Sequence, residues 1–294
     1  MGTTRRGIAP VIAVLLCAAA AGGGEPSSLQ AYFLDGDPVA KWKLPKRLKE
    51  ISGLASTPDG RLFGHDDETA TLYQLDFEDD EIVKSFSLGT PALRGDFEGL
   101  AVANDRFFLV SSSGRLHEAR EGEDGDSVDF VVHETKLGRH CEIEGLAYEP
   151  EDDTLLLLCK TSRKKKFRNF VVVHRWSLAA GESAEPPHLL VPLIDILDRI
   201  EAQSFRPSGI ERHPISGNYF IVAAREGAIA EITSSGALVS ARSLPKRHRQ
   251  VEGIAFSPDG GLVLGDEGSK SRARLTVYRA RPAAGQADSG PISR

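Results

Sequence analysis

The sequence predicts an all-β protein built as a five-bladed β-propeller, and three observations lead to this prediction. A five-residue motif with a central glycine recurs five times along the chain. Short apolar strand patterns fill the intervals between the motifs, and a leftover strand pattern precedes the first motif. Strands at this spacing are typical of radially repeated all-β folds. The five copies are Ile51–Ala55, Phe97–Ala101, Ile143–Ala147, Pro207–Glu211 and Val251–Ala255.

The spacing of the motifs matches the length of a propeller blade. The central glycines lie 46, 46, 64 and 44 residues apart, and a four-stranded blade needs roughly 40–50 residues. The long interval contains an insertion, Leu193–Phe205, whose apolar residues have helical spacing. A sixth blade would need a sixth motif, for which only this interval has room, so we expect five blades.

Each repeat continues through the same series of elements. The motif strand is followed by a tight turn, as at Thr57–Gly60 and Ser257–Gly260, where proline and glycine supply the required dihedrals. A second apolar strand comes next, and in the first repeat the third and fourth strands are expected at Thr71–Leu75 and Ile82–Leu88. The second strands are expected at Leu62-Phe63, Phe107–Val110, Leu155–Leu158, Tyr219–Val222 and Leu262–Leu264.

The two ends of the chain are expected to complete one blade together. The last repeat has only three strands, and the extra strand pattern Val39–Leu44 precedes the first motif. The tetrapeptide Leu44–Arg47 recurs as Leu244–Arg247, each copy nine residues before a motif glycine. We therefore expect Val39–Leu44 to be the outer strand of the last blade. The predicted propeller spans 39–280, between a linker at 25–38 and a disordered tail at 281–294.

Residues 1–24 have the pattern of an export signal. Arg5 and Arg6 are followed by the apolar run Ile8–Cys17 and a small-residue cleavage zone at Ala18–Ala21. The apolar run is shorter than the roughly 20 residues that span a bilayer. We expect cleavage, and a monomeric protein of the periplasm or cell envelope.

Lipidation of Cys17 is the alternative to plain cleavage, and it would attach the protein to a membrane. The residue before Cys17 is Leu16, whereas lipoprotein signals have a small residue there.

The composition excludes two broad classes of protein. Hydrophobic residues make up 40% of the chain and the net charge is only −6, which excludes global disorder. A nucleic-acid-binding protein would need a basic stripe, and the charge is acidic. Two Trp and five Tyr also leave few side chains for stacking on single strands. We therefore expect no nucleic-acid partner.

Cys141 and Cys159 are candidates for a disulfide bond if the protein is exported. A hairpin around the turn Glu149–Asp153 would place them nearly opposite each other. A slip of one residue would turn the two side chains to opposite faces and prevent the bond. The alternative is a pair of small buried apolar residues.

One mouth of the central channel collects the candidate functional residues. The residue before each motif glycine is expected to stand there, and because second strands run antiparallel to motif strands, their ends reach the same mouth. The motif residues are Ser52, Glu98, Glu144, Ser208 and Glu252. The second-strand ends carry His65-Asp66-Asp67, Ser111–Ser113, Lys160-Thr161, Arg225-Glu226 and Asp266-Glu267.

Carboxylates around one narrow channel repel one another unless a cation or protons neutralise them. Oxygen ligands without sulfur select a hard cation, Ca²⁺ before Mg²⁺. The predicted ligands are Glu98, Glu144, Glu252, Asp66, Asp67, Asp266 and Glu267. In the alternative, the motif glutamates bond to the neighbouring blade's backbone and staple the ring, while Lys160 and Arg225 pair with them.

Three other features carry weaker signals. His65 is expected to be an exposed loop residue rather than a catalytic base. Ser111–Ser113 lacks the Gly-x-Ser-x-Gly context of a nucleophile. The basic run Arg163–Arg168 is expected to be a solvated loop, although it could touch an anionic lipid surface.

The order of Ser and Glu before the motif glycines, at Ser52, Glu98, Glu144, Ser208 and Glu252, resembles the SdiA-regulated family of bacterial envelope proteins. The resemblance covers roughly residues 39–280. It implies a five-bladed propeller, distantly related to NHL-repeat proteins, with a bound calcium ion. It implies no reaction.

Three functions are compatible with these features. The favoured one is a calcium-associated binding or scaffold protein that binds a small molecule or an envelope protein through its channel face. The second is a metal-dependent hydrolase of phosphate or carboxylate esters, because esterase-like phytases share the Gly-Leu-Ala and acidic-loop signatures and a metal would activate water. The lack of a dense basic patch at the mouth argues against a phytase. The third is a structural interaction module without an ion.

Overall fold

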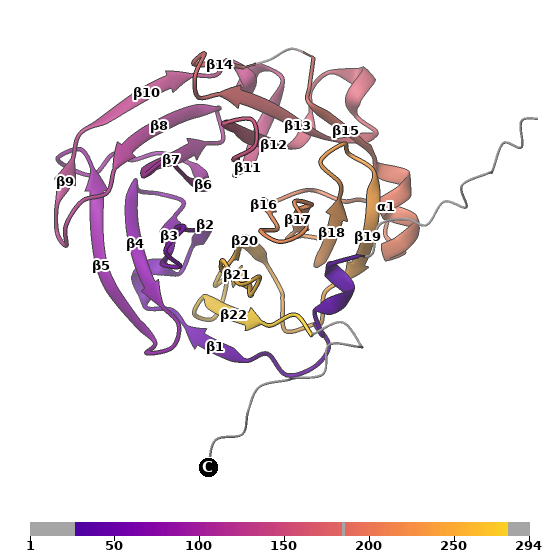
Figure 1. The fold of residues 1–294 in the computed structure, drawn as a ribbon, viewed down its shortest axis with the longest axis horizontal. Coiled ribbons are helices and arrows are strands. Elements are labelled where there is room, and N and C mark those ends of the chain that lie inside the picture. The colour runs from indigo at the N-terminus through magenta and orange to yellow at the C-terminus, as the bar shows by residue number, and fades with distance from the viewer. Residues whose placement is uncertain (1–26, 184–185, 282–294) are drawn as a thin grey trace, which may run out of the picture.

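Five β-sheets surround a central axis in the computed structural model, which describes residues 27–183 and 186–281 (Figure 1). The predicted five-bladed β-propeller is therefore confirmed. Each motif forms the innermost strand of its blade. These strands are β2 (Ile51–Ser56), β6 (Phe97–Ala103), β11 (Cys141–Glu149), β16 (Gly209–Arg212) and β20 (Val251–Phe256).

The remaining strands follow outward within each blade. The first blade adds β3 (Leu62–Asp66), β4 (Thr71–Asp76), β5 (Glu81–Leu88) and the short parallel strand β9 (Ser127–Val128). The second adds β7 (Arg106–Ser111), β8 (Arg115–Arg120) and β10 (Phe130–Glu134). The third adds β12 (Thr154–Ser162) and β13 (Phe170–Ser177), and β13 pairs with both β14 (Glu182–Ser183) and β15 (Leu189–Pro192).

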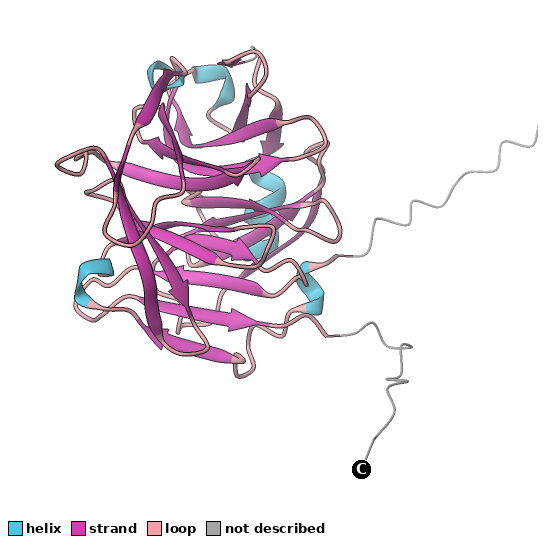
Figure 2. Cartoon of the chain, turned by 60° about the vertical axis from the view of Figure 1, so that its left-hand side comes forward, coloured by secondary structure: helices cyan, strands magenta, loops and turns pink. Residues whose placement is uncertain are grey.

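The fourth and fifth blades each have four strands. The fourth adds β17 (Tyr219–Ala223), β18 (Ala228–Ile232) and β19 (Leu238–Ser243). The fifth adds β21 (Leu262–Asp266), β22 (Arg274–Tyr278) and β1 (Ala40–Lys43). Figure 2 shows strands throughout the ring, with helices only as short elements. The helices are η1 (Leu29–Ala31), η2 (Lys46–Leu48), η3 (Leu137–Arg139), η4 (Lys165–Phe167) and α1 (Leu193–Ile200).

The ring closes as the sequence predicts. Strand β1 pairs antiparallel with β22, with Ala40 opposite Val277 and Lys43 opposite Arg274. Figure 1 shows the indigo β1 beside the yellow β22. The first and last strands of the propeller therefore belong to one sheet, and the chain itself joins the two ends of the ring.

The linker predicted at 25–38 is instead part of the domain from residue 27 onward. Leu29, Tyr32 and Leu34 are fully buried between the fourth and fifth blades. The buried Glu231 carboxylate accepts hydrogen bonds from the backbone N–H groups of Ser28 and Leu29, at 3.0 and 2.9 Å. Apolar burial and this anchor order a segment whose composition suggests flexibility. The predicted signal at 1–24 and the tail after residue 281 lie outside the described residues.

The core consists of five apolar clusters, each formed by elements of two adjacent blades. Phe63 of the first blade meets Phe107 of the second edge-on, with ring centroids 4.8 Å apart. Helix α1 confirms the predicted helical insertion, and its Ile196 and Ile200 join the cluster between the third and fourth blades. No helix in the described part of the chain is long and apolar enough to cross a membrane.

The motif glycines allow neighbouring inner strands to approach closely. A Cβ atom on Gly53 would lie 2.7 Å from the backbone nitrogen of Leu100, and one on Gly99 would lie 2.6 Å from that of Leu146. A Cβ on Gly253 would lie 2.6 Å from the carbonyl oxygen of Ser52, which closes the circle. Distances below 3.0 Å exclude any larger residue, so packing at the axis requires glycine at these three positions. A Cβ atom on Gly145 would lie 3.1 Å from its nearest neighbour, the backbone nitrogen of Ile210.

A disulfide joins Cys141 and Cys159, whose Cα atoms are 5.6 Å apart. The hairpin brings the two cysteines nearly opposite each other, as predicted. Cys141 pairs with Ser162 and Cys159 with Ile143, so the two cysteines are two positions from direct opposition. The bond therefore runs diagonally between the two strands, within the Cα separation that disulfides accept.

We expect denatured, unreduced protein comprising residues 27–294 to contain no free thiol. The bond closes a loop of 18 residues, so reduction should cost about 3 kcal/mol in the free energy of unfolding. For a domain of this size that corresponds to a fall in Tm of roughly 6–12 °C. Two titratable thiols per chain before reduction would contradict the bond.

Truncation tests the role of the N-terminal segment in ring closure. Removing residues 1–45 deletes β1 and the buried Leu29, Tyr32 and Trp42, each worth about 1.5–3 kcal/mol. It also exposes β22 as a sheet edge, so we expect aggregation or loss of cooperative unfolding. The control removes only residues 1–26 and should unfold as the parent does. Equal stability of the two truncated proteins, measured by thermal unfolding, would show that β1 does not close the ring.

Candidate functional site

A β-bulge positions the residue before the motif glycine in four of the five inner strands. Phe97 pairs with Ser111 and Gly99 with Val110, which leaves Glu98 without a partner in the ladder. The pairing shifts in the same way around Ser52, Glu144 and Glu252. A bulge redirects the side chain of its extra residue. The repeated motif thus sets both the close approach of the strands and the position of the acids at the channel.

The three motif glutamates share one electrostatic environment. Burial raises the pKa of Glu98 to about 9, and the nearby Glu144 and Glu252 raise it further. Burial also raises the pKa of Glu144 to about 7, against the effect of Lys160. The pKa of Glu252 rises to about 7 through burial and the neighbouring Glu267. The structure therefore brings the three predicted acids together at one mouth.

Asp67 and Glu267 extend this group of acids from equivalent positions just after β3 and β21. Burial, followed by Glu50 and Asp66, raises the pKa of Asp67 to about 6. The pKa of Glu267 is raised by burial and then by Asp67. The Oδ1 atom of Asp67 is buried without a hydrogen-bond partner. The acidic mouth is defined here as Glu98, Glu144, Glu252, Asp67 and Glu267.

Lys160 is the cation most closely engaged with the acidic mouth. Its Nζ atom lies 2.9 Å from Oε1 of Glu144 and 3.6 Å from Oε1 of Glu142. Lys160 also lowers the pKa values of Glu98 and Glu252 through its charge. The predicted pairing of Lys160 with a motif glutamate is therefore present in the structure, but one ammonium group cannot neutralise the whole set.

Arg225, the second predicted cation, is exposed on the wall of a side pocket. This pocket has a volume of about 310 Å³ and is also lined by Glu144, Lys160 and Glu252. Arg206 and Arg249 complete its basic wall. The side pocket therefore joins the acidic mouth to three arginines.

Asp66 and Asp266, which were predicted as metal ligands, instead stabilise the local backbone. Asp66 accepts hydrogen bonds from the N–H groups of Glu68 and Thr69, at 3.1 and 3.0 Å, and from the Thr69 hydroxyl. Asp266 lies 2.7 Å from Nδ1 of His248 and accepts the Arg249 N–H at 2.9 Å. These hydrogen bonds engage both carboxylates, so Asp66 and Asp266 are not counted among the candidate metal ligands of the mouth.

Two other predicted mouth residues also have structural roles. The Ser208 hydroxyl donates to the carbonyl oxygen of Val251 at 2.7 Å and accepts the Ala224 N–H at 3.0 Å, which ties the fourth blade to the fifth. Glu226 accepts hydrogen bonds from the Ser204 hydroxyl and the Arg206 N–H, at 2.6 and 3.0 Å, and so fastens the loop before β16. Both side chains therefore make hydrogen bonds that stabilise the ring.

The prediction that His65 is an exposed loop residue is wrong. His65 is fully buried in β3, and its Nε2 atom accepts the Gly53 N–H at 3.0 Å. Its Nδ1 atom lies 2.8 Å from the carbonyl oxygen of Asp66. Burial lowers the pKa of His65 to about 4, so the ring is neutral. His65 therefore accepts the hydrogen bond of the Gly53 N–H group, which the bulge prevents from pairing with the neighbouring strand.

No three of the five described carboxylates of the acidic mouth bring their oxygen atoms within 4.8 Å of one another. Among the described residues, one trio of His, Cys, Asp or Glu places its ligand atoms within 4.8 Å of one another, namely Cys141, Cys159 and His174. The disulfide engages both sulfur atoms of that trio. A cation at the acidic mouth would therefore be held by fewer than three carboxylates in this arrangement, with water or carbonyl oxygens completing its shell.

Sequence reasoning missed two acids. Glu50 precedes β2 and helps to raise the pKa values of Asp67 and Glu267, but no pattern in the sequence marks it. Glu211 carries a visible signal, because it occupies the last position of the motif, where the other four copies have alanine. It lies at the opposite end of the channel axis from the acidic mouth, since all five inner strands begin at that mouth.

Comparison with solved structures shows the fold alone. A glutaminyl cyclase from Myxococcus xanthus is 15% identical with a TM-score of 0.56, over 83% of this chain and 95% of that one. A Kuenenia stuttgartiensis hydrazine synthase is 11% identical with a TM-score of 0.50, over 82% and 97%. A streptogramin B lyase is 12% identical with a TM-score of 0.48, over 81% and 97%. No protein-family model and no curated protein sequence matches the chain.

The raised pKa of Glu98 predicts how stability depends on pH in metal-free protein. Folded Glu98 keeps its proton up to a pH of about 9, whereas the unfolded group loses it near 4.3. The stability that Glu98 contributes is therefore full below that lower value and is lost as the pH rises through the window. Because Gln mimics the protonated group, E98Q should match the parent near pH 4.5 and exceed its Tm by roughly 3 °C or more at pH 8.

The matched control is E134Q, which changes an exposed glutamate on β10 that pairs with Arg115. Its Tm difference from the parent should stay small across the same pH range. A constant difference between E98Q and the parent in chelator-treated samples would contradict a buried, protonated Glu98.

Proposed function

We propose that this protein is a binding protein whose acidic mouth holds a calcium ion. The observation that carries the proposal is that the carboxyl groups of one mouth all have raised pKa values, while Lys160 makes an ion pair with one of them, Glu144. Keeping several buried or half-buried acids together costs free energy in the absence of a counter-charge. A bound divalent cation would offset that cost.

The donor chemistry fits a hard cation. The acidic mouth offers carboxylate oxygens from four blades and no sulfur, and such ligands favour Ca²⁺. The partnerless Oδ1 of Asp67 is a free acceptor within the group. Glu98 and Glu252, which line the same central cavity, are the two carboxylates that we assign to the ion, because Lys160 already engages Glu144.

The side pocket next to the acidic mouth suggests the ligand class. Lys160, Arg206, Arg225 and Arg249 line this space of about 310 Å³ together with Glu144 and Glu252. A small molecule or an envelope-protein side chain with an anionic group would meet these cations and the calcium ion together. The ion would supply a point of positive charge for that group, while the arginines would orient it.

Export to the periplasm or cell envelope, and membership of the SdiA-regulated family, belong to the same proposal. The motif order that resembles this family implies a calcium ion, as the acids of the mouth do independently. The disulfide between Cys141 and Cys159 is of the kind that persists in oxidising compartments. The export pattern at residues 1–24 is compatible with that setting.

Calcium binding should raise thermal stability. At a hundredfold excess over Kd, a ligand specific to the native state adds about 2.7 kcal/mol, which is roughly 5–10 °C in Tm for this domain. We expect Ca²⁺ to raise the Tm of chelator-treated protein, with Mg²⁺ less effective. Glu252→Gln should abolish most of this rise, while the exposed control E134Q should keep it.

An unchanged Tm with and without calcium, supported by a flat calorimetric titration, would refute the proposal and favour the hydrogen-bonded staple. The same preparations test the hydrolase alternative. Calcium-dependent turnover of p-nitrophenyl phosphate or p-nitrophenyl acetate that E252Q abolishes would replace a binding function with a catalytic one.

A further inference from the structure

A second pocket lies at the end of the channel axis opposite the acidic mouth. It has a volume of about 670 Å³, which is within the range of small-molecule sites. Each blade contributes to it from the end of its inner strand or the turn that follows. The lining residues that matter here are Glu211, Asp105, Tyr148, Val102, Phe256 and Pro58.

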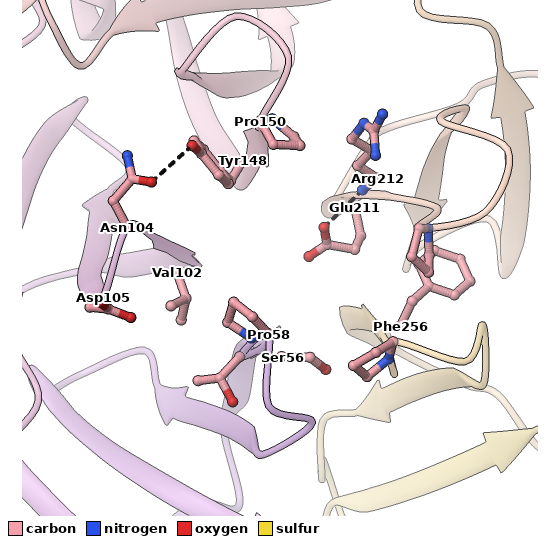
Figure 3. A pocket seen from close by; sticks show the side chains of 13 residues that line it. Ser56, Pro58, Val102, Asn104, Asp105, Tyr148, Pro150, Glu211, Arg212 and Phe256 are labelled. Carbon is pink, nitrogen blue, oxygen red and sulfur yellow. Dashed lines mark hydrogen bonds between the residues drawn. The ribbon is translucent and has the colours of Figure 1, made fainter.

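Glu211 distinguishes this pocket from the rest of the repeat. The equivalent residues Ala55, Ala101, Ala147 and Ala255 are all buried and apolar. Figure 3 shows the Glu211 carboxyl group turned toward the middle of the pocket, while the Arg212 guanidinium group points elsewhere. The other four repeats have a buried alanine at this position, so packing of the blade does not require a charged residue here. The carboxyl group of Glu211 is therefore a candidate for binding a ligand.

The nearby cation Arg212 is paired with two other acids, although its charge still lowers the pKa of Glu211 against the effect of burial. The Arg212 side chain makes ion pairs with Glu149 at 3.1 Å and with Glu151 at 3.0 Å. The Glu211 carboxylate accepts a hydrogen bond from the backbone N–H of Arg212, at 2.8 Å. Burial raises the pKa of Glu211 to about 8, as expected for a carboxyl group without a paired cation.

Besides Glu211 and Arg212, the charged residue that lines the pocket is Asp105, which is exposed on its wall. The Tyr148 hydroxyl, also in the lining, donates a hydrogen bond to Asp153 at 2.9 Å. The apolar part of the wall is provided by Val102, Phe256 and several prolines. The pocket therefore combines a half-buried carboxyl group that has no cation of its own with apolar surface and a second acid, Asp105.

We propose that this pocket binds a small organic amine, with the ammonium group on Glu211 and the apolar body against Phe256, Val102 and Pro58. The ammonium group of the ligand would form an ion pair with Glu211, because Arg212 is paired with Glu149 and Glu151 instead. Burial of the ligand's apolar body against the apolar wall of the pocket would add affinity. The site is separate from the acidic mouth and independent of the function proposed for that mouth.

Calorimetric titration with 2-phenylethylamine tests the proposal, since this probe carries one ammonium group and one phenyl ring. The measurements are made in saturating Ca²⁺, so that the acidic mouth contributes the same background throughout. We expect the amine to bind, and the neutral isostere 2-phenylethanol to bind at least tenfold more weakly. Glu211→Gln and Glu211→Ala should each weaken amine binding at least tenfold. The alanine variant restores the residue of the other four repeats and should fold.

The control is E134Q, which removes one negative charge from a remote exposed site and should bind the amine as the parent does. Unchanged binding in folded E211Q and E211A would overturn the proposal. So would equal affinity for the amine and the alcohol, or no detectable heat at about 10 mM amine. Loss of amine binding in E252Q with full binding in E211Q would move the amine to the acidic mouth, and would also overturn it.

Discussion

The close approach of five backbones at the propeller axis is the constraint on which the rest of the structure depends. At each contact a motif glycine faces the backbone of the next inner strand, and any Cβ atom on Gly53, Gly99 or Gly253 would overlap it. The central cavity is consequently only about 10 Å³, about the smallest volume that can hold one water molecule. Ligand chemistry is therefore confined to the two ends of the axis, where the inner strands begin and where they end.

The two ends have different electrostatics because they arise from different features of the inner strands. At the beginning of the strands, β-bulges present Glu98, Glu144 and Glu252 beside acids that follow the second strands. Their raised pKa values reflect burial and mutual repulsion, which Lys160 relieves only locally. At the far end a single departure from the repeat, Glu211, places a carboxyl group in a pocket whose apolar wall is made by Val102, Phe256 and several prolines. One repeated scaffold thus carries two chemically distinct candidate sites.

Connections between residues far apart in the chain hold this ring together. Strand β1 completes the last sheet, and the segment before it packs between the fourth and fifth blades through Leu29 and Tyr32. The Tyr32 hydroxyl donates to the carbonyl oxygen of Gly260 at 2.5 Å. The Ser208 hydroxyl donates a hydrogen bond to the carbonyl oxygen of Val251 in the fifth blade. In the first blade, His65 accepts a hydrogen bond from the N–H group of Gly53, which the bulge leaves unpaired. Several polar residues near the mouth therefore make the hydrogen bonds that close the ring. The carboxyl groups of the acidic mouth, in contrast, keep raised pKa values because of their burial and because too little positive charge lies near them.

The sequence by itself determined the propeller, its blade number, the closing strand and the mouth position of Glu98, Glu144 and Glu252, because each follows from local patterns that repeat with the blades. Tertiary structure alone decided the rest. Asp66 and Asp67 are adjacent, yet only Asp67 belongs to the acidic mouth, because donors from the following turn capture Asp66. Asp266 is likewise captured by His248 and Arg249 from the segment before β20. Whether Cys141 and Cys159 are bonded depended on whether their side chains meet across the hairpin, which hydrophobic patterns do not encode. Which way a carboxylate faces depends on the donors that folding brings to it, and those donors have no fixed spacing in the sequence.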